Sequence, residues 1–314
     1  MESSTGIDIS ANGATLRRPS PISTASTASS ASLGSHHNGQ SSNAVPPPGI
    51  GSPETPTSGF PPDAASYPGQ KRSLAGIALR AFCLGAALVV GVFLGTLLAL
   101  LPRLFPGTTG IDLLSPLWRL PFFLAALSTF HFLEFWTTAR YNTQATSIYS
   151  FLLTANWPAY AIAHLAASME CLVRYTLLRN VDVWSYLPFT IPRTAVVMAG
   201  FLVVAIGQSV RTAAMVQAGR SFNHTIQHKK ATSHALVTDG VYALFRHPSY
   251  FGFFWWALGT QLVLGNVMCL AGYTAVLWRF FSMRIRHEET LLVRFFGDDY
   301  VQYRKRVGTK IPFL

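Results

Sequence analysis

The segment LFRHPSYFGFFWWALGTQ, at residues 244–261, sets an arginine and a histidine at the start of an aromatic run without charge. After His247 the chain carries no charged residue before Arg279. Ionisable groups beside such a run are costly unless they are used or can reach water. Pro248 favours a helix start, because its missing N–H would be unpaired there in any case. Ser249 would then lie in the first turn, where free backbone N–H groups can hold an anionic group such as a carboxylate.

A second group of charged residues follows the apolar run, in the segment RIRHEETLLVRFF. Arg284 and Glu288 are four residues apart, so in a helix they would share one face, with Glu289 beside them. An intrahelical ion pair, worth roughly a few tenths of a kcal/mol, is the simplest explanation. Alternatively, the planar guanidinium of Arg284 suits a carboxylate ligand. Glu288 can accept hydrogen bonds from amino or hydroxyl groups of a ligand.

Four histidines lie close together ahead of this region, at positions His224, His228, His234 and His247. The first two would share a face if their segment were helical. Zinc sites use cysteine, histidine and carboxylate ligands, but the segment from residue 217 to residue 250 has no cysteine and only one carboxylate, Asp239. No metal site is therefore expected.

These groups must be positioned by membrane helices. The chain has 314 residues, of which 50% are hydrophobic and 12% charged, about half the charge of a soluble domain. Apolar windows at 81–102, 117–138, 147–167 and 194–210 each suit one crossing. The window at 248–283 fits two helices of about 17 residues joined at Gly265-Asn266, a turn-forming pair. The sequence thus predicts an all-α polytopic membrane protein with about six transmembrane helices, including a C-terminal helical hairpin.

The composition divides the chain into three regions. Residues 1–72 are rich in Ser, Thr, Pro and Gly and are predicted to form a disordered cytosolic tail. Residues 73–210 would hold the first four helices, and residues 211–314 a polar loop, the hairpin and a cytosolic C-terminal segment. Basic residues cluster before the first window, between the fourth and fifth helices and after the last, which predicts that both termini are cytosolic. Anionic lipid headgroups explain the net charge of +11, so no nucleic-acid partner is expected.

A short hairpin returns its two ends to the same interface. We therefore expect His247 and Arg284 to face one shared pocket. Arg246 is interpreted either as part of the polar rim of this pocket or as a side chain that reaches the lipid headgroups.

Polar residues also occur within the other predicted spans. His131 and Glu134 would lie on one helical face at membrane depth, where ionisable groups usually face a bundle interior. A polar clamp between spans is the first interpretation, and contact with a substrate is the second. Asn156 and Pro158 would serve packing, with Pro158 kinking the third helix.

Three motifs carry a resemblance to a known family: RHPSYFGFFWWALGTQ, HALVTDGVYALFRHPSY and RHEETLLVRFFGDDYVQYRKRV. Together they resemble the isoprenylcysteine carboxyl methyltransferases of the endoplasmic reticulum, as does STFHFLEFWTTARYN in the second span. The resemblance implies methyl transfer from S-adenosylmethionine to the C-terminal carboxylate of a farnesylated or geranylgeranylated cysteine. The substrates would be processed CaaX proteins, namely small GTPases or prenylated peptide pheromones, and the location the endoplasmic reticulum membrane.

The same resemblance makes residues 211–314 the catalytic region, with a cofactor-binding loop ahead of the hairpin. It also assigns roles to individual residues. Arg284 would meet the substrate, and Arg284 and Glu288 would be the catalytic residues. The cofactor would be held by Gln227, His234, Ala235, Leu236, Val237, Tyr242, His247, Pro248, Ser249, Tyr250 and Glu288.

These assignments agree with elementary chemistry. A peptide α-carboxyl group has a pKa near 3.5, so the nucleophile is already ionised and needs no general base. Tyr242 and Tyr250 offer aromatic faces for adenine or for the cationic sulfonium. The alternatives from the sequence are a membrane phospholipid methyltransferase, an NADPH-dependent sterol reductase-like enzyme and a non-enzymatic membrane scaffold.

Overall fold

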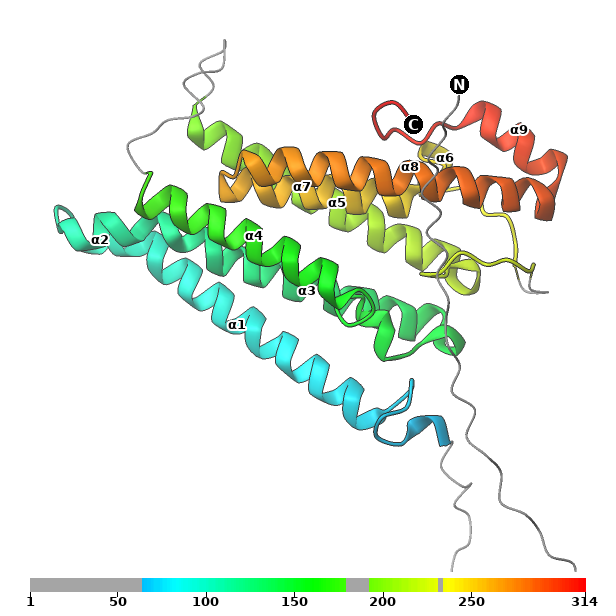
Figure 1. The fold of residues 1–314 in the computed structure, drawn as a ribbon, viewed down its shortest axis with the longest axis horizontal. Helices are drawn as coiled ribbons and strands as arrows, with labels where there is room; N and C mark the ends of the chain where they lie inside the picture. Colours follow the sequence, from blue (N-terminus) through cyan, green and yellow to red (C-terminus); the bar gives the residue numbers. More distant parts are fainter. Residues whose placement is uncertain (1–63, 179–191, 231–233) are drawn as a thin grey trace, which may run out of the picture. The chain divides into compact units, whose positions relative to one another are not determined.

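The structure, a computed structural model, describes residues 64–178, 192–230 and 234–314, and these ranges hold helices and turns but no strand (Figure 1). The predicted tail up to residue 63 lies outside them. The long helices are α1 (Leu74–Leu104), α3 (Arg119–Tyr141), α4 (Trp157–Thr176), α5 (Arg193–Ala218), α7 (Pro248–Leu264) and α8 (Met268–Phe296). Short helices are η1 (Ala64–Ser66), α2 (Thr109–Leu114), η2 (Ser115–Trp118), η3 (Thr143–Ala145), η4 (Ile148–Phe151), η6 (Gly219–Ser221), α6 (Val241–Leu244) and α9 (Asp298–Arg306).

This architecture confirms the predicted helical fold class. Within the described residues, three helical stretches are long and apolar enough to cross a membrane: α1, the continuous stretch Thr109–Tyr141, and Arg193–Ser221. The count of six crossings stays a prediction.

The predicted hairpin of α7 and α8 is confirmed. Gly265 ends α7 in the left-handed conformation, with φ of 74°, and the chain reverses through buried Asn266. The Asn266 amide donates to the carbonyl of Ala167 in α4, and Glu170 of α4 accepts from the backbone N–H groups of Val267, Met268 and Cys269 at 2.6, 2.8 and 2.6 Å. A carboxylate at a helix N-terminus satisfies otherwise unpaired N–H groups. Helix α4 therefore fixes the turn of the hairpin.

Helix α5 packs along α7 through glycines. A Cβ atom added to Gly207 would lie 2.6 Å from the backbone nitrogen of Trp256, and one added to Gly252 would lie 2.6 Å from the carbonyl oxygen of Gly207. Only glycine permits this approach of the two backbones. The close contact holds the first turns of α7 against the C-terminal half of α5.

The third apolar window differs from its prediction. Its helix begins at Trp157, because the chain at residues 148–151 forms the short helix η4 and then turns. Pro158 consequently lies in the first turn of α4, where a missing N–H leaves no hydrogen bond unmade, and the predicted kink at Pro158 is wrong. Asn156 occupies the N-cap position of α4.

The predicted polar clamp between spans is confirmed. Glu134 of α3 pairs with Arg211 of α5, and both side chains are buried. His131 donates through Nδ1 to the carbonyl of Phe151, 2.8 Å away. Because that carbonyl can only accept, the imidazole carries its proton on Nδ1.

Candidate active site

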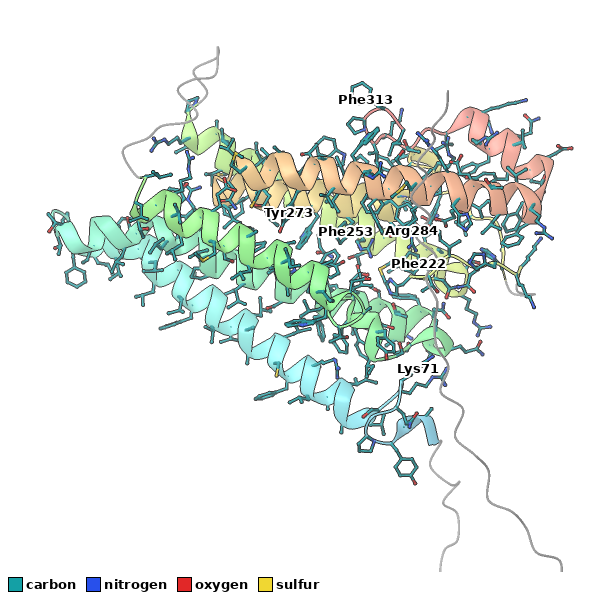
Figure 2. The ribbon with its side chains drawn as sticks, viewed as in Figure 1. Lys71, Phe222, Phe253, Tyr273, Arg284 and Phe313 are labelled. Carbon is teal, nitrogen blue, oxygen red and sulfur yellow. The ribbon has the colours of Figure 1, made fainter. Side chains whose placement is uncertain are left out.

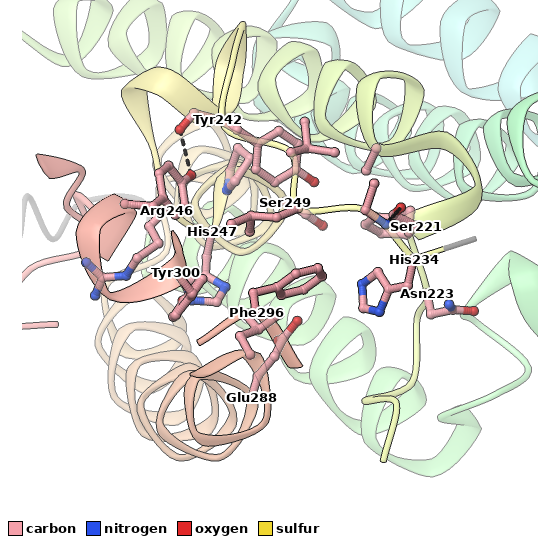
Figure 3. A pocket seen from close by; sticks show the side chains of 18 of the residues that line it. Ser221, Asn223, His234, Tyr242, Arg246, His247, Ser249, Glu288, Phe296 and Tyr300 are labelled. Atoms are coloured by element: carbon pink, nitrogen blue, oxygen red, sulfur yellow. Dashed lines mark hydrogen bonds between the residues drawn. The ribbon is translucent and has the colours of Figure 1, made fainter. Parts of the chain in front are cut away.

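A pocket opens between the loop that follows α5, the first turn of α7 and the C-terminal half of α8; we call it the first pocket (Figure 3). It is lined by all of the predicted cofactor residues except Gln227. These are His234, Ala235, Leu236, Val237, Tyr242, His247, Pro248, Ser249, Tyr250 and Glu288. The fold therefore brings these residues together at one pocket.

Two smaller pockets adjoin it. A side pocket contains Gln227 and shares His234 and Glu288 with the first pocket. The second pocket is lined by Leu152, Asn156, Tyr160, Arg211, Phe222, Asn223, His224, Ser249, Tyr250, Phe253, Phe280, Phe281 and Arg284. Figure 2 labels Arg284 close to Phe222 and Phe253, which border this same pocket. Arg284 thus lies outside the first pocket and borders the side pocket and the second pocket. Because His247 lines only the first pocket, the prediction that His247 and Arg284 face one shared pocket is wrong.

Helix α6 places Tyr242 in the first pocket. Gly240 precedes the helix with φ of 52°, a left-handed conformation that favours glycine, and the side chain of Gln217 lies against it. The Gln217 side chain accepts from the N–H of Val241 at 3.0 Å. The backbone carbonyl of Tyr242 accepts from the hydroxyl of Tyr303 in α9 at 2.6 Å. Helices α5 and α9 together fix this tyrosine.

Arg246 and His247 both form hydrogen bonds with the carboxylate of Glu289. Arg246 donates through Nε to Oε1 of Glu289 at 2.5 Å, and through Nη1 to the carbonyl of Val307 at 2.7 Å. His247 donates through Nε2 to the same Glu289 oxygen at 3.2 Å. Partial burial opposes ionisation of Glu289, but the hydrogen bond and charge of His247 and the charge of Arg246 bring its pKa down to about 2. Arg246 also lines the first pocket, which supports the polar-rim interpretation.

Tyr250 connects the first and second pockets. Its hydroxyl donates to Oε2 of Glu288 at 2.5 Å and accepts from Nε of Arg284 at 2.8 Å. Arg284 also donates through Nη2 to the carbonyl of His224 at 2.5 Å. Across the described ranges no ion pair joins Arg284 to Glu288, so the simple intrahelical pair is not what the fold forms.

The loop histidines have separate surroundings. The segment with His224 and His228 is not helical, so the two do not share a helical face. His224 is within 3.6 Å of Glu134 through Nδ1 and 3.2 Å from the Thr138 hydroxyl through Nε2. Burial lowers the pKa of His224 to about 4, against the opposing charge of Glu134. In the parts of the chain that the structure describes, no three His, Cys, Asp or Glu side chains are grouped to hold a metal ion.

Comparison with known proteins decides which chemistry this arrangement belongs to. The sequence profile of the isoprenylcysteine carboxyl methyltransferase (ICMT) family matches residues 198–294. A relative from Saccharomyces cerevisiae, a protein-S-isoprenylcysteine O-methyltransferase, is 41% identical over 256 residues, which cover 81% of this chain and 98% of the relative. The chain belongs to the isoprenylcysteine carboxyl methyltransferase family. It is accordingly an enzyme that methylates carboxyl groups.

Other members extend the likeness. The protein-S-isoprenylcysteine O-methyltransferase of Homo sapiens is 40% identical over 192 residues, covering 61% of this chain and 64% of the human protein. The structure of a eukaryotic intramembrane Ras methyltransferase of the ICMT family superposes with a TM-score of 0.62 and 33% identity, covering 76% of each chain. The shared fold makes this chain a membrane-spanning member of the family.

Sequence reasoning missed two residues of this ICMT site. Arg211 donates through Nη1 to Oγ and to the carbonyl of Ser249, at 2.8 and 3.0 Å, while Glu134 neutralises it. The sequence did contain a signal for Arg211: Glu134 is an acid at membrane depth, and such an acid requires a basic partner. Tyr300 of α9 lines the first pocket, and its buried hydroxyl has no hydrogen-bond partner among the described residues. No sequence pattern distinguished this tyrosine from its neighbours.

Proposed function

We propose that this enzyme transfers the methyl group of S-adenosylmethionine to the C-terminal carboxylate of a farnesylated or geranylgeranylated cysteine. One observation carries the proposal. The hydroxyl of Tyr250 bonds Glu288, which lines the first pocket, and Arg284, which lines the second. A cofactor in one pocket and a carboxylate in the other would meet across the wall formed by Ser249 and Tyr250.

The first pocket fits S-adenosylmethionine in its chemistry. Glu288 can accept from amino or hydroxyl groups, and the rings of Tyr242 and Phe296 provide faces for adenine or for a sulfonium. The hydroxyl of Tyr300 is buried and has no partner in the described part of the chain. An unsatisfied buried hydroxyl costs about 1–3 kcal/mol, so a polar ligand there would be stabilising. The cofactor would supply an electrophilic methyl group. Gln227 borders only the side pocket and would contact whichever part of the cofactor extends there.

The second pocket fits a prenylated cysteine. Aromatic side chains of Phe253, Phe280 and Phe281 offer an apolar surface for an isoprenoid chain. Two arginines border the pocket, but Arg211 is neutralised by Glu134. Arg284 forms no ion pair among the described residues, which leaves its charge available for the substrate carboxylate. Its planar fork suits such a ligand.

The residues of the site act by positioning. The attacking carboxylate is ionised at neutral pH, so no side chain has to remove a proton. Arg284 would orient the carboxylate, and Glu288 with the tyrosines would fix the cofactor. Near-attack alignment of two bound reactants can supply several kcal/mol, on the order of 7–11 in favourable cases.

The remaining assignments follow from this activity. The substrates would be CaaX-processed small GTPases or peptide pheromones at the endoplasmic reticulum membrane, with both termini of the enzyme in the cytosol. The catalytic region, residues 211–314, would work together with α3, because Glu134 neutralises Arg211. Family membership favours this activity over phospholipid methylation, sterol reduction or a scaffold role.

A methylation assay tests the proposal. Membranes that contain the full chain should transfer tritium from methyl-labelled S-adenosylmethionine to N-acetyl-farnesylcysteine, and the label should be released as methanol by base because the product is an ester. N-acetylcysteine, which lacks the prenyl group, is the matched control and should stay unlabelled. Equal labelling of both compounds, or a base-stable product, would contradict the proposal.

A further inference from the structure

Tyr250 lies between Glu288, which is assigned to the cofactor, and Arg284, which is assigned to the substrate. Its hydroxyl donates to Glu288 at 2.5 Å and accepts from Arg284 at 2.8 Å. We propose that this hydroxyl couples the two half-sites, so that cofactor and prenylcysteine each bind more tightly when the other is present. The inference rests on the proposed function and adds cooperativity to it.

The ring of Tyr250 is held in place, so its hydroxyl cannot simply swing away. The ring stacks on His247 with centroids 5.4 Å apart and an interplanar angle of 8°. On α8 it stacks on Phe281 at 5.1 Å and 27°. His247 is in turn bonded to Glu289. The hydroxyl can change partners without moving the ring, because rotation about the C–O bond redirects its proton.

The three groups form a polarised chain. A hydroxyl that donates to a carboxylate becomes a better acceptor, which strengthens the bond from Arg284. Two donor groups of Arg284 are already hydrogen-bonded: Nε donates to Tyr250, and Nη2 donates to the carbonyl of His224. In this state the Nε–Nη2 side of its guanidinium is not free for bidentate binding of a carboxylate.

Cofactor binding would change the hydrogen bonds of Tyr250 to Glu288 and Arg284. Amino or hydroxyl groups that donate to Glu288 compete with the Tyr250 hydroxyl for the carboxylate oxygens. The phenolic oxygen is then less polarised and holds Nε of Arg284 more weakly. Arg284 becomes available to the substrate carboxylate, and the released Tyr250 hydroxyl can donate to that same anion. By linkage, substrate binding must favour cofactor binding by an equal factor.

Equilibrium binding to the purified full chain in detergent tests the coupling without turnover. The affinity of S-adenosylhomocysteine is measured with and without saturating N-acetyl-farnesylcysteine, and the affinity of N-acetyl-farnesylcysteine with and without S-adenosylhomocysteine. In the wild-type protein each ligand should tighten the other by about five-fold or more, the lower end of typical coupling. Tyr250→Phe keeps both ring stacks and should bind both ligands with a coupling factor close to one.

Two further variants make the test specific. Tyr242→Phe also removes a hydroxyl from the first pocket, but that hydroxyl contacts the carbonyl of Ala214 at 3.3 Å, so the coupling factor should stay at the wild-type value whatever happens to affinity. Arg284→Lys keeps the positive charge but lacks Nε, and it should lose the coupling as Tyr250→Phe does.

Different outcomes bear on different claims. Two results would overturn the role of Tyr250. One is a coupling factor in Tyr250→Phe equal to that of the wild type. The other is a wild-type protein that binds both ligands but shows no coupling between them. A wild-type protein that binds neither ligand would overturn the proposed function, and the coupling with it. If Tyr250→Phe binds too weakly to measure, Arg284→Lys decides: retained coupling there overturns the inference.

Discussion

Glu134 of α3 and Arg211 of α5 form a buried bidentate ion pair directly beside Ser249 in the first turn of α7. Nε and Nη2 of Arg211 donate to the two carboxylate oxygens of Glu134, and Nη1 donates to Ser249. Three helices are thus tied together at one point on the wall that the first and second pockets share. The position of Ser249 in the site depends on a pair of residues 77 positions apart in the chain.

The first prediction concerns this pair. Glu134→Gln or Arg211→Met alone leaves one charge buried without a partner, and each should destabilise the protein by about 3–5 kcal/mol. The double variant removes both charges and should be less destabilised than the sum of the single variants. Thermal unfolding in one detergent, analysed as a double-mutant cycle, measures the difference. Additive effects of the two single changes would show that the pair is not coupled.

The second prediction separates Arg284 from Glu288. Arg284→Ala should lose methyl transfer but retain S-adenosylhomocysteine binding, whereas Glu288→Ala should weaken that binding directly. Arg284→Lys keeps the charge without the bidentate fork, so turnover should fall about ten-fold or more, equivalent to about 1.4 kcal/mol of transition-state positioning. Near-wild-type turnover in Arg284→Ala would exclude the proposed substrate contact.

The sequence predicts the C-terminal hairpin better than it predicts the contacts between helices that support the hairpin. The hairpin follows from a window too long for one crossing with a glycine-asparagine pair in it. The window and the pair are local features, visible in the order of residues. The two ends of the hairpin do lie close together, but His247 shares the first pocket with Glu288 and not, as was expected, with Arg284. The partner of Glu134 depends instead on how α3 packs against α5, which no local pattern encodes. Pro158 shows a similar limit, since an uncharged stretch does not reveal where its helix begins.

For Tyr250, likewise, the sequence predicts the position in the chain but not the hydrogen bonds. Its place in the Arg-His-Pro motif indicates a position at the start of α7, and the resemblance assigns it to the cofactor. Its bonds to both Glu288 and Arg284 depend on the approach of α7 to α8 and on the side-chain rotamers. Such a bridge can be found only in three dimensions.

The third prediction concerns the N-terminal region. Deletion of residues 1–63 should leave activity and membrane insertion intact, because no predicted span or site residue lies there. A deletion that continues through residue 72 is the matched comparison and should lower stability. It removes the carbonyl of Lys71, which accepts from Ile148 at 2.8 Å, and the guanidinium of Arg72, which donates to the carbonyl of Gln144 at 2.5 Å. Thermal unfolding of both deletions measures this, and an inactive but inserted 1–63 deletion would assign the tail a part in the site.

The fourth prediction uses the unpartnered hydroxyl of Tyr300. Tyr300→Phe removes a hydroxyl that forms no hydrogen bond to any residue that the structure describes, so stability should not fall. If the hydroxyl binds the cofactor, S-adenosylhomocysteine affinity should drop by about 0.5–1.5 kcal/mol, up to roughly ten-fold. Tyr303→Phe is the control, because the Tyr303 hydroxyl donates to the carbonyl of Tyr242 and its loss should lower stability. Unchanged affinity in Tyr300→Phe would remove Tyr300 from the site.

The last prediction concerns pH. Burial lowers the pKa of His224 to about 4, from 6.5 for an exposed histidine, so the imidazole is neutral in the folded protein. Glu134 opposes this shift, while Arg211 and Arg284 add to it. The unfolded chain binds a proton at His224 more readily than the folded one. The contribution of the neutral side chain is therefore fully present above pH 6.5 and is lost as the pH falls toward 4.

A substitution isolates this contribution from other titrating groups. His224→Gln cannot titrate, so the difference in melting temperature between wild type and variant should be constant above pH 6.5. Between pH 6.5 and about pH 4, the melting temperature of the wild type should fall steadily relative to that of the variant. Glu289 also makes stability depend on pH, but in a more acidic range. Because its pKa is lowered in the folded protein, the stability it contributes falls only below pH 4.5. That decline should appear in both the wild type and the variant. A difference that is flat between pH 6.5 and 4 would show that His224 is protonated as easily in the folded protein as in the unfolded chain. A difference that moves in favour of the wild type on acidification would show that protonated His224 is instead stabilised by Glu134.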